Sequence, residues 1–175
     1  MKLFRYITSA ALFALAISSS ALANEVRTDY DHHANFSRYR TYSWERVQTS
    51  NPLWQDRIKE AVDHDLQAKG WQRVDSGGDV ALVAVGATHN EQEYQTFYNG
   101  LGGWRWRRFG DTATTTVTTY RIGTLVLDMY DANSKDLVWR GWSSDTLSDK
   151  PEKNEDKLNK SVGKMFEHFP PGEKG

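Results

Sequence analysis

Alternating hydrophobic and polar positions are clearest in residues 120–143. Large apolar side chains recur at every second position from Leu125 to Met129, which is the period of a β-strand. A polar segment rich in turn-forming residues follows at 131–136, and the strand pattern resumes at 137–142. So short a link joins antiparallel strands, because a parallel return needs a crossover of about a dozen residues. The pattern therefore predicts a β-hairpin.

The hairpin also has an expected register. Asp128 and Arg140 carry opposite charges, and we expect them to lie directly opposite each other on one face, where such a pair contributes on the order of 0.2–1 kcal/mol. This register places Met129 beside Trp139 and Val126 beside Trp142.

Other strand patterns are shorter. We expect strands at Val26–Tyr30, Thr41–Trp44, Trp71–Val74, Asp79–Thr88 and Thr112–Thr119. The run within Asp79–Thr88 is apolar without interruption, which is typical of a strand that lies deep in a sheet. We expect a long loop between Asn90 and Asp111, and a second loop at residues 144–156.

Two segments have helical spacing. Asn51 can cap the free amides of the first helix and Pro52 suits its first position, while Gly70 is placed to end it in a left-handed turn. Its apolar face comprises Ile58, Ala61, Val62 and Leu66. The closing helix presents Leu158, Val162, Met165, Phe166 and Phe169 on one face, and Pro170 with Pro171 stops it.

These elements predict an α+β fold, with an antiparallel-rich β-sheet and the two helices packed on one face. The length suits one domain with a genuine core, expected at residues 24–169, followed by a flexible tail at 170–175.

The first 23 residues have the features of an export signal. Lys2 and Arg5 give a positive start, residues 10–17 are apolar, and residues 21–23 form a small-x-small cleavage site. We expect cleavage before Asn24 and a periplasmic product without a further membrane-spanning segment. The chain has 0 cysteines, so a disulfide framework, thiolate chemistry and a lipid anchor on an N-terminal cysteine are all excluded.

Charge and motifs exclude other classes of protein. The 22 basic and 23 acidic residues nearly balance, which argues against bulk nucleic-acid binding. The glycine-rich fingerprints of dinucleotide and nucleoside triphosphate sites are absent, so no cofactor is expected.

The segment 100–109 has a composition that a protein core does not readily explain. Its candidate ligand-binding residues are Trp104, Arg105, Trp106, Arg107 and Arg108. One interpretation is a long hairpin loop held by its own tryptophans. The functional alternative is contact with an anionic or glycan partner, since arginine pairs with phosphate and indole rings stack on apolar faces. A cationic aromatic segment of this kind could equally rest on a membrane surface.

Catalytic and metal sites are weakly indicated. The polar residues that a hydrolase could use are Asp128, Asp131, Asp136 and Arg140, and each has a ready role in a turn or a cross-strand pair. His32 and His33 stand among carboxylates, but neighbouring strand residues point to opposite faces and would rarely share an ion. We therefore expect no catalytic residue, no metal and a solvated turn at this histidine pair.

Several ordered motifs resemble one bacterial family, domain of unknown function 4136 (DUF4136). They are Asp29-Tyr30-Asp31, Asn35-Phe36-Ser37, Thr41-Tyr42-Ser43-Trp44, Arg57-Ile58, Lys69-Gly70-Trp71, Gly123-Thr124-Leu125, Leu137-Val138-Trp139-Arg140-Gly141 and Phe169-Pro170. The chain departs from the family's lipoproteins by lacking a cysteine after the signal, and Asn35 stands where an aspartate is more usual.

The resemblance implies an exported α+β envelope protein of Gram-negative bacteria, with no established activity and no catalytic residue to carry over. We expect a non-catalytic binding or envelope-maintenance module, whose partner is an envelope protein or a glycan. Glycan or lipopolysaccharide binding through residues 104–109 is the alternative, and a hydrolase is the weaker one.

Overall fold

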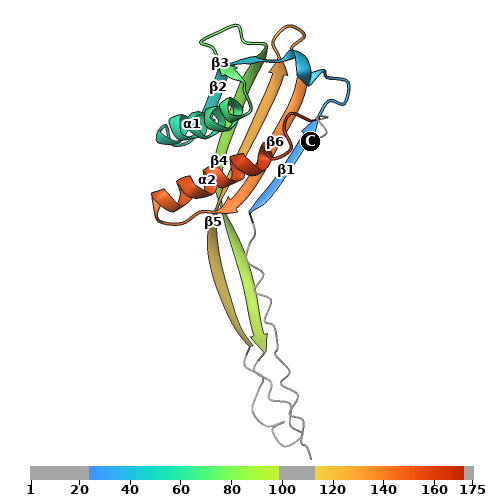
Figure 1. Cartoon of the computed structure of the whole chain (residues 1–175). Coiled ribbons are helices and arrows are strands. Elements are labelled where there is room, and N and C mark those ends of the chain that lie inside the picture. The colour runs from blue at the N-terminus through green and yellow to red at the C-terminus, as the bar shows by residue number, and fades with distance from the viewer. Residues whose placement is uncertain (1–23, 99–112, 172–175) are drawn as a thin grey trace, which may run out of the picture.

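The computed structural model describes residues 24–98 and 113–171, which form a six-stranded sheet with two helices (Figure 1). The strands are ordered β1-β6-β5-β4-β2-β3 across the sheet. In chain order the elements are β1 (Glu25–Tyr30), the 3-10 turn η1 (Phe36–Arg38), β2 (Thr41–Thr49), α1 (Leu53–Ala68), β3 (Gln72–Arg73), β4 (Val80–Tyr98), β5 (Ala113–Asp131), β6 (Leu137–Thr146) and α2 (Pro151–Met165).

The fold is α+β as predicted, but the sheet is mixed, so the expectation of an antiparallel-rich sheet is wrong. β2 pairs in parallel with both β3 and β4, whereas the pairs β4–β5, β5–β6 and β1–β6 are antiparallel. The reason is the crossover through α1, which returns the chain to the sheet in the direction of β2.

The predicted hairpin between β5 and β6 is confirmed with its register. Asp128 is the partner of Arg140, and the two other expected pairs are also formed, namely Met129 with Trp139 and Val126 with Trp142. The turn is built around Asp131, whose Oδ1 accepts the amides of Asn133 and Ser134 at 2.8 and 3.0 Å.

β4 and β5 are much longer than predicted. Each has 19 residues, and they pair from Val80 with Asp131 to Tyr98 with Ala113. Beyond the ends of β2 and β6 they continue as a two-stranded ribbon that projects from the sheet (Figure 1), which we call the arm (residues 87–98 and 113–121). Residues 90–98 of the loop expected at Asn90–Asp111 are therefore strand, and the remainder of that expected loop lies outside the described residues.

The loop expected at residues 144–156 is also wrong in part. β6 continues to Thr146 and α2 already begins at Pro151, because proline without an amide partner is well accommodated at a helix start. The helix ends at Met165, so Phe166 and Phe169 pack just beyond it.

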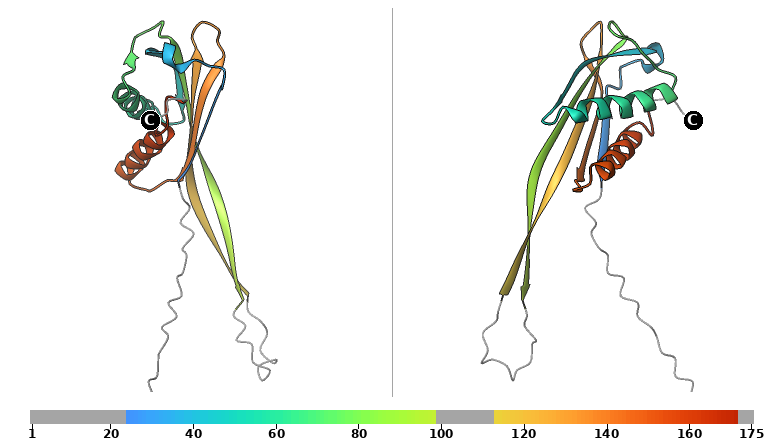
Figure 2. Two further views of the ribbon diagram at one scale, coloured as in Figure 1. Left: turned by 45° about the vertical axis from the view of Figure 1, so that its right-hand side comes forward. Right: turned by 90° about the vertical axis from the view of Figure 1, so that its left-hand side faces the viewer.

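Both helices pack on the same face of the sheet, as expected (Figure 2). Asn51 accepts the amide of Leu53 with its side-chain oxygen at 3.1 Å, so it caps α1 as predicted. Gly70 follows the helix with a φ of +82°, which is the left-handed conformation that a glycine adopts at a helix end.

The core lies between this face and the helices, and aromatic rings fill one end of it. Phe169 contacts the rings of Phe36, Trp71, Trp139 and Phe166, with centroid separations between 5.3 and 5.8 Å. Much of the tryptophan and phenylalanine content of the described chain is therefore accounted for by packing. Trp54, near the start of α1, lies outside this group of rings and is only partly buried against the core.

Candidate functional site

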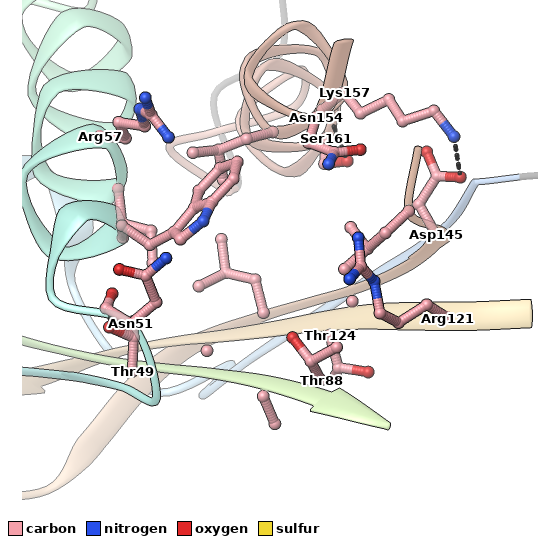
Figure 3. A pocket seen from close by; sticks show the side chains of 18 of the residues that line it. Thr49, Asn51, Arg57, Thr88, Arg121, Thr124, Asp145, Asn154, Lys157 and Ser161 are labelled. Atoms are coloured by element: carbon pink, nitrogen blue, oxygen red, sulfur yellow. Dashed lines mark hydrogen bonds and ion pairs between the residues drawn. The ribbon is translucent and has the colours of Figure 1, made fainter. Parts of the chain in front are cut away.

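A cavity of about 540 Å³ lies at the end of the core nearest the arm. The first turns of α1 and α2 form its walls, and β4, β5 and β6 form its floor, as Figure 3 shows for the labelled residues. This volume is within the range of small-molecule pockets, roughly 300–1,000 Å³.

Two rows of cross-strand neighbours form the floor. Each row takes one residue from β4, β5 and β6, and the rows are Gly86–Leu125–Ser143 and Thr88–Gly123–Asp145. A Cβ atom on Gly123 would lie 2.7 Å from Leu147 Cδ2, and one on Gly86 would lie 3.1 Å from Thr49 Cγ2. The glycines therefore allow the walls to approach the sheet closely, which is a common role of glycine within strands.

The inner walls are apolar. α1 contributes Leu53, Trp54 and Ile58, α2 contributes Leu158, and Leu147 follows β6. Leu53 is 69% exposed, so an apolar side chain stands in solvent next to the opening. Such walls favour an apolar ligand body over water.

Side-chain hydrogen bonds fix the loops that enter both helices. Thr49 donates its hydroxyl to the carbonyl of Asn51 at 2.6 Å, ahead of α1. In the first turn of α2, the side chain of Asn154 accepts from the Ser148 amide and donates to the Ser148 carbonyl, both at 2.7 Å. These bonds hold the cavity walls at defined positions without a ligand.

Charged groups surround the apolar walls. Lys157 donates to Asp145 Oδ1 at 3.0 Å (Figure 3). It also donates to the carbonyl of Thr146 at 2.5 Å, so its charge is largely satisfied. Arg121, at the base of the arm, makes two long contacts, with 3.5 Å between its Nη2 and the carbonyl oxygen of Ser148 and 3.9 Å between the same Nη2 and Asp149 Oδ1. Because Asp149 is fully exposed, that pair contributes little. Arg121 is therefore available to an anionic group in the cavity.

Arg57 is a further cation of the lining. Its guanidinium lies 4.9 Å from the ring centroid of Trp54, and its Nε is 3.2 Å from Glu155 Oε2 on α2. The stacked arginine keeps the indole in place at the wall and presents charge above an apolar surface.

The described groups with shifted pKa values lie outside this cavity, where their side chains connect different elements of the fold. Burial and a 2.9 Å hydrogen bond to Asp131 raise the pKa of Tyr39 to about 12. Burial, followed by a hydrogen bond to Asp63, raises the pKa of Tyr42 well above its ordinary value. Hydrogen bonds from the Arg40 and Thr41 amides and the Thr41 hydroxyl lower the pKa of Asp79.

The polar residues considered for catalysis have structural roles. Asp128 pairs with Arg140 on the face away from the helices, and Asp131 organises the hairpin turn. The backbone of Asp136 closes the same turn, accepting from the amide of Asp131 at 2.9 Å. His32 and His33 are exposed in the turn after β1, and no cluster of three metal-binding side chains exists in residues 24–98 and 113–171.

The predicted binding segment lies elsewhere in the sequence: Trp104, Arg105, Trp106, Arg107 and Arg108 all fall outside the described residues. Within the described part of the chain, no helix is long and apolar enough to cross a bilayer.

Sequence reasoning missed the cavity, whose lining comes from segments scattered between residues 49 and 161. One signal was available. Gly86 and Gly123 interrupt runs of strand-forming residues, and glycine in a strand often marks close approach by another group.

Comparisons with known proteins agree with this fold. The model of the DUF4136 family, a domain of unknown function, matches residues 26–171. No curated protein sequence matches the chain.

Solved structures give more distant likenesses. The chain is similar to a PDZ domain protein from Parabacteroides distasonis ATCC 8503, with a TM-score of 0.58 and 13% identity, over 87% of this chain and 37% of that one. It is also similar to the PelC dodecamer from Paraburkholderia phytofirmans, with a TM-score of 0.50 and 13% identity, over 82% of this chain and 95% of that one. At such identities the likeness concerns the fold alone.

Proposed function

The chain belongs to the DUF4136 family, whose molecular function is unknown, and we propose that it is an exported, non-catalytic module that binds a small anionic amphiphile in its cavity. The single observation that carries this proposal is a cavity of about 540 Å³ with apolar walls and an available arginine at its edge.

The chemistry of the lining supports an amphiphile. An alkyl or aromatic body can lie against Trp54, Leu125 and Leu158, where burial of apolar surface contributes about 25 cal/mol per Å². An anionic head can then reach Arg121, whose contact with Asp149 is long and exposed and is easily replaced. Binding thus needs no rearrangement of the paired Lys157.

Export supports the same class of partner, since amphiphiles are plentiful in a bacterial envelope. The proposal of a periplasmic product rests on the signal-like pattern of residues 1–23. N-terminal sequencing of the protein from the periplasmic fraction should begin at Asn24. An intact Met1 on a cytoplasmic product would exclude export.

Calorimetric titration with dodecyl phosphate and with dodecyl maltoside tests the binding site. Thr88→Trp should fill the floor of the cavity and abolish binding, whereas Thr116→Trp on the arm, a matched change at an exposed site, should leave binding unchanged. Arg121→Gln should weaken dodecyl phosphate by about tenfold, the equivalent of one charge-assisted contact of about 1.4 kcal/mol. Its effect on dodecyl maltoside should be small.

Two results would overturn the proposal. The first is the absence of any heat of binding with the phosphate amphiphile. The second is equal binding by the wild-type protein and the Thr88→Trp variant, because the ligand would then lie outside the cavity.

A further inference from the structure

The face of the sheet opposite the helices is left open by the residues that the structure describes (Figure 2). The central strand β4 nevertheless presents Ala81, Val83 and Val85 to this face, and Val85 is 40% exposed. Because β4 is apolar on both sides, it has the pattern of a strand that is buried on both faces. We therefore expect another protein surface to cover the open face of β4.

Cross-strand register arranges the open face in rows, each with one residue from β2, β4, β5, β6 and β1. The charged row is Arg46–Val83–Asp128–Arg140–Asp29. The apolar row, next along the strands, is Gln48–Val85–Val126–Trp142–Arg27.

The two rows differ in where their charge lies. Asp128 and Arg140 neutralise each other inside the charged row, which leaves Arg46 and Asp29 as opposite charges at its two ends. Neither end residue has an ion-pair partner among the described residues. The apolar row has its large side chains in the middle, with Arg27 lying 5.7 Å from the Trp142 ring centroid at one end.

We infer that a second copy of this chain covers the open face, related by a two-fold axis that runs along β5 between the two sheets. Rotation about this axis reverses the order of the strands. Arg46 then faces Asp29 of the second copy at both margins, and Val85 faces Trp142. The apolar row then meets itself at the centre, the Asp128–Arg140 pairs of the two copies meet beside it with their charges already neutralised, and the unpaired charges lie at the rim, which is the usual anatomy of a protein interface.

The charges distinguish this axis from the other symmetric arrangement. An axis that ran across the strands, along the charged row, would keep the strand order and place Arg46 opposite Arg46 and Asp29 opposite Asp29. Like charges facing each other oppose association. The axis along β5 is therefore favoured, and it also makes both arms project from the same end of the dimer.

The size of the face predicts a weak dimer. Five strands spaced about 4.8 Å apart and six residue steps of about 3.3 Å give a face of roughly 20 by 20 Å on each copy. Two such faces bury about 1,000 Å² once side-chain relief is included, which is the lower end for specific interfaces. We expect a dissociation constant in the micromolar range.

Sedimentation equilibrium of the chain with residues 1–23 removed tests the inference through a charge exchange. Arg46→Glu and Asp29→Arg should each weaken the dimer by about tenfold or more, because each places like charges opposite each other. The double variant should return to within about threefold of the wild type, since the two charges are exchanged but still opposite. Both positions are exposed, so each variant should fold, as thermal melts can verify.

Lys160→Glu, an exposed charge reversal on α2, is the matched control and should leave the dimer unchanged. Val85→Asp should abolish the dimer by placing a charge in the apolar row. A wild-type protein that is monomeric at about 1 mM would overturn the inference. A double variant as weak as the two single variants would overturn the axis along β5.

Discussion

Arg140 binds both carboxylate oxygens of Asp128 across the β5–β6 hairpin. Its Nε lies 2.6 Å from Oδ1 and its Nη2 lies 2.7 Å from Oδ2, a bidentate geometry. Asp128 is buried, with 7% of its surface exposed, whereas the side chain of Arg140 is 49% exposed. Solvent therefore screens the pair in part. Hydrogen bonding to Asp128 also raises the pKa of Arg140.

Removal of the arginine should therefore destabilise the hairpin. We expect Arg140→Met to lower the free energy of unfolding by about 2 kcal/mol, because it leaves a buried carboxylate without its partner. Urea unfolding measures this loss. Arg121→Met, which breaks an exposed 3.9 Å ion pair with Asp149 and an exposed 3.5 Å hydrogen bond to the Ser148 carbonyl, should change stability by less than about 0.5 kcal/mol. Equal effects of the two changes would contradict the importance of the bidentate pair.

Asp63 joins α1 to the parallel edge of the sheet. Its carboxylate accepts from the hydroxyl of Tyr42, the indole of Trp44 and the guanidinium of Arg73, at 2.9, 2.9 and 2.8 Å. Asp63→Ala should cost about 3 kcal/mol, since the hydroxyl of a fully buried tyrosine loses its acceptor. Asp65→Ala is the neighbouring control, because the one side chain that Asp65 hydrogen-bonds within the described residues is the exposed His64. A chemical-denaturation midpoint that shifts equally in both variants would refute this role.

Stability should fall at acid pH through Asp79 and Asp131. Backbone hydrogen bonds lower the pKa of both carboxyl groups below the ordinary value of 3.8, the Arg40 amide making the largest contribution at Asp79 and the Ser134 amide at Asp131. The unfolded chain therefore binds more protons below about pH 5, and stability increases with pH in that window. Their contribution is complete above the unfolded pKa and is lost as pH falls through the folded values.

The measurement is the free energy of unfolding between pH 6 and about pH 2. Asp79→Asn combined with Asp131→Asn should lower stability at pH 6 and flatten its dependence on pH. Glu152→Gln, at an exposed position of α2, should leave the slope unchanged. If the double variant retained the full acid slope, other groups would be responsible.

The role of the tryptophans in the segment 100–109 remains a prediction. Alternation along an extended segment places Trp104 and Trp106 on one side and their neighbouring arginines on the other, so we expect at least one indole to pack on the domain. Loss of a packed aromatic costs roughly 3–5 kcal/mol, which is visible in the melting temperature of Trp104→Ala or Trp106→Ala. If the free energy of unfolding of both variants stays within about 0.5 kcal/mol of the wild-type value, a binding platform is favoured. Retention on purified peptidoglycan would then test glycan binding.

The register of the β5–β6 hairpin was predictable because local information determines it. Hydrophobic alternation, the turn residues and one opposite-charge pair all lie within residues 120–143, and they agree. The cap at Asn51 and the turn at Gly70 were predictable for the same reason.

The parallel pairing of β2 and the length of the arm depend on contacts between residues that are far apart in the sequence. The strand–helix–strand order around α1 favours a parallel return, but the order in which strands meet in space is a tertiary property. Residues 89–93 are polar at every position, so neither face shows the alternation by which strands are recognised. The cavity was hidden because periodicity identifies the apolar face of each helix and not the places where two such faces fail to meet the sheet.

The residues of the arm do not by themselves determine the register in which its two strands pair. Its β5 side is a run rich in threonine, which alone would pair almost equally well after a slip of one residue. Within the core, the same two strands pair Leu82 with Met129, both fully buried, and a slip there would turn these side chains out into water. Since the pairing of β4 with β5 continues without a bulge, the match of Tyr94 with Val117 far out on the arm is decided by packing beneath the helices. Substitutions among the arm's threonines should accordingly leave the strand register unchanged. The pairing of β4 with β5 along the whole arm is set by the register of these strands in the core.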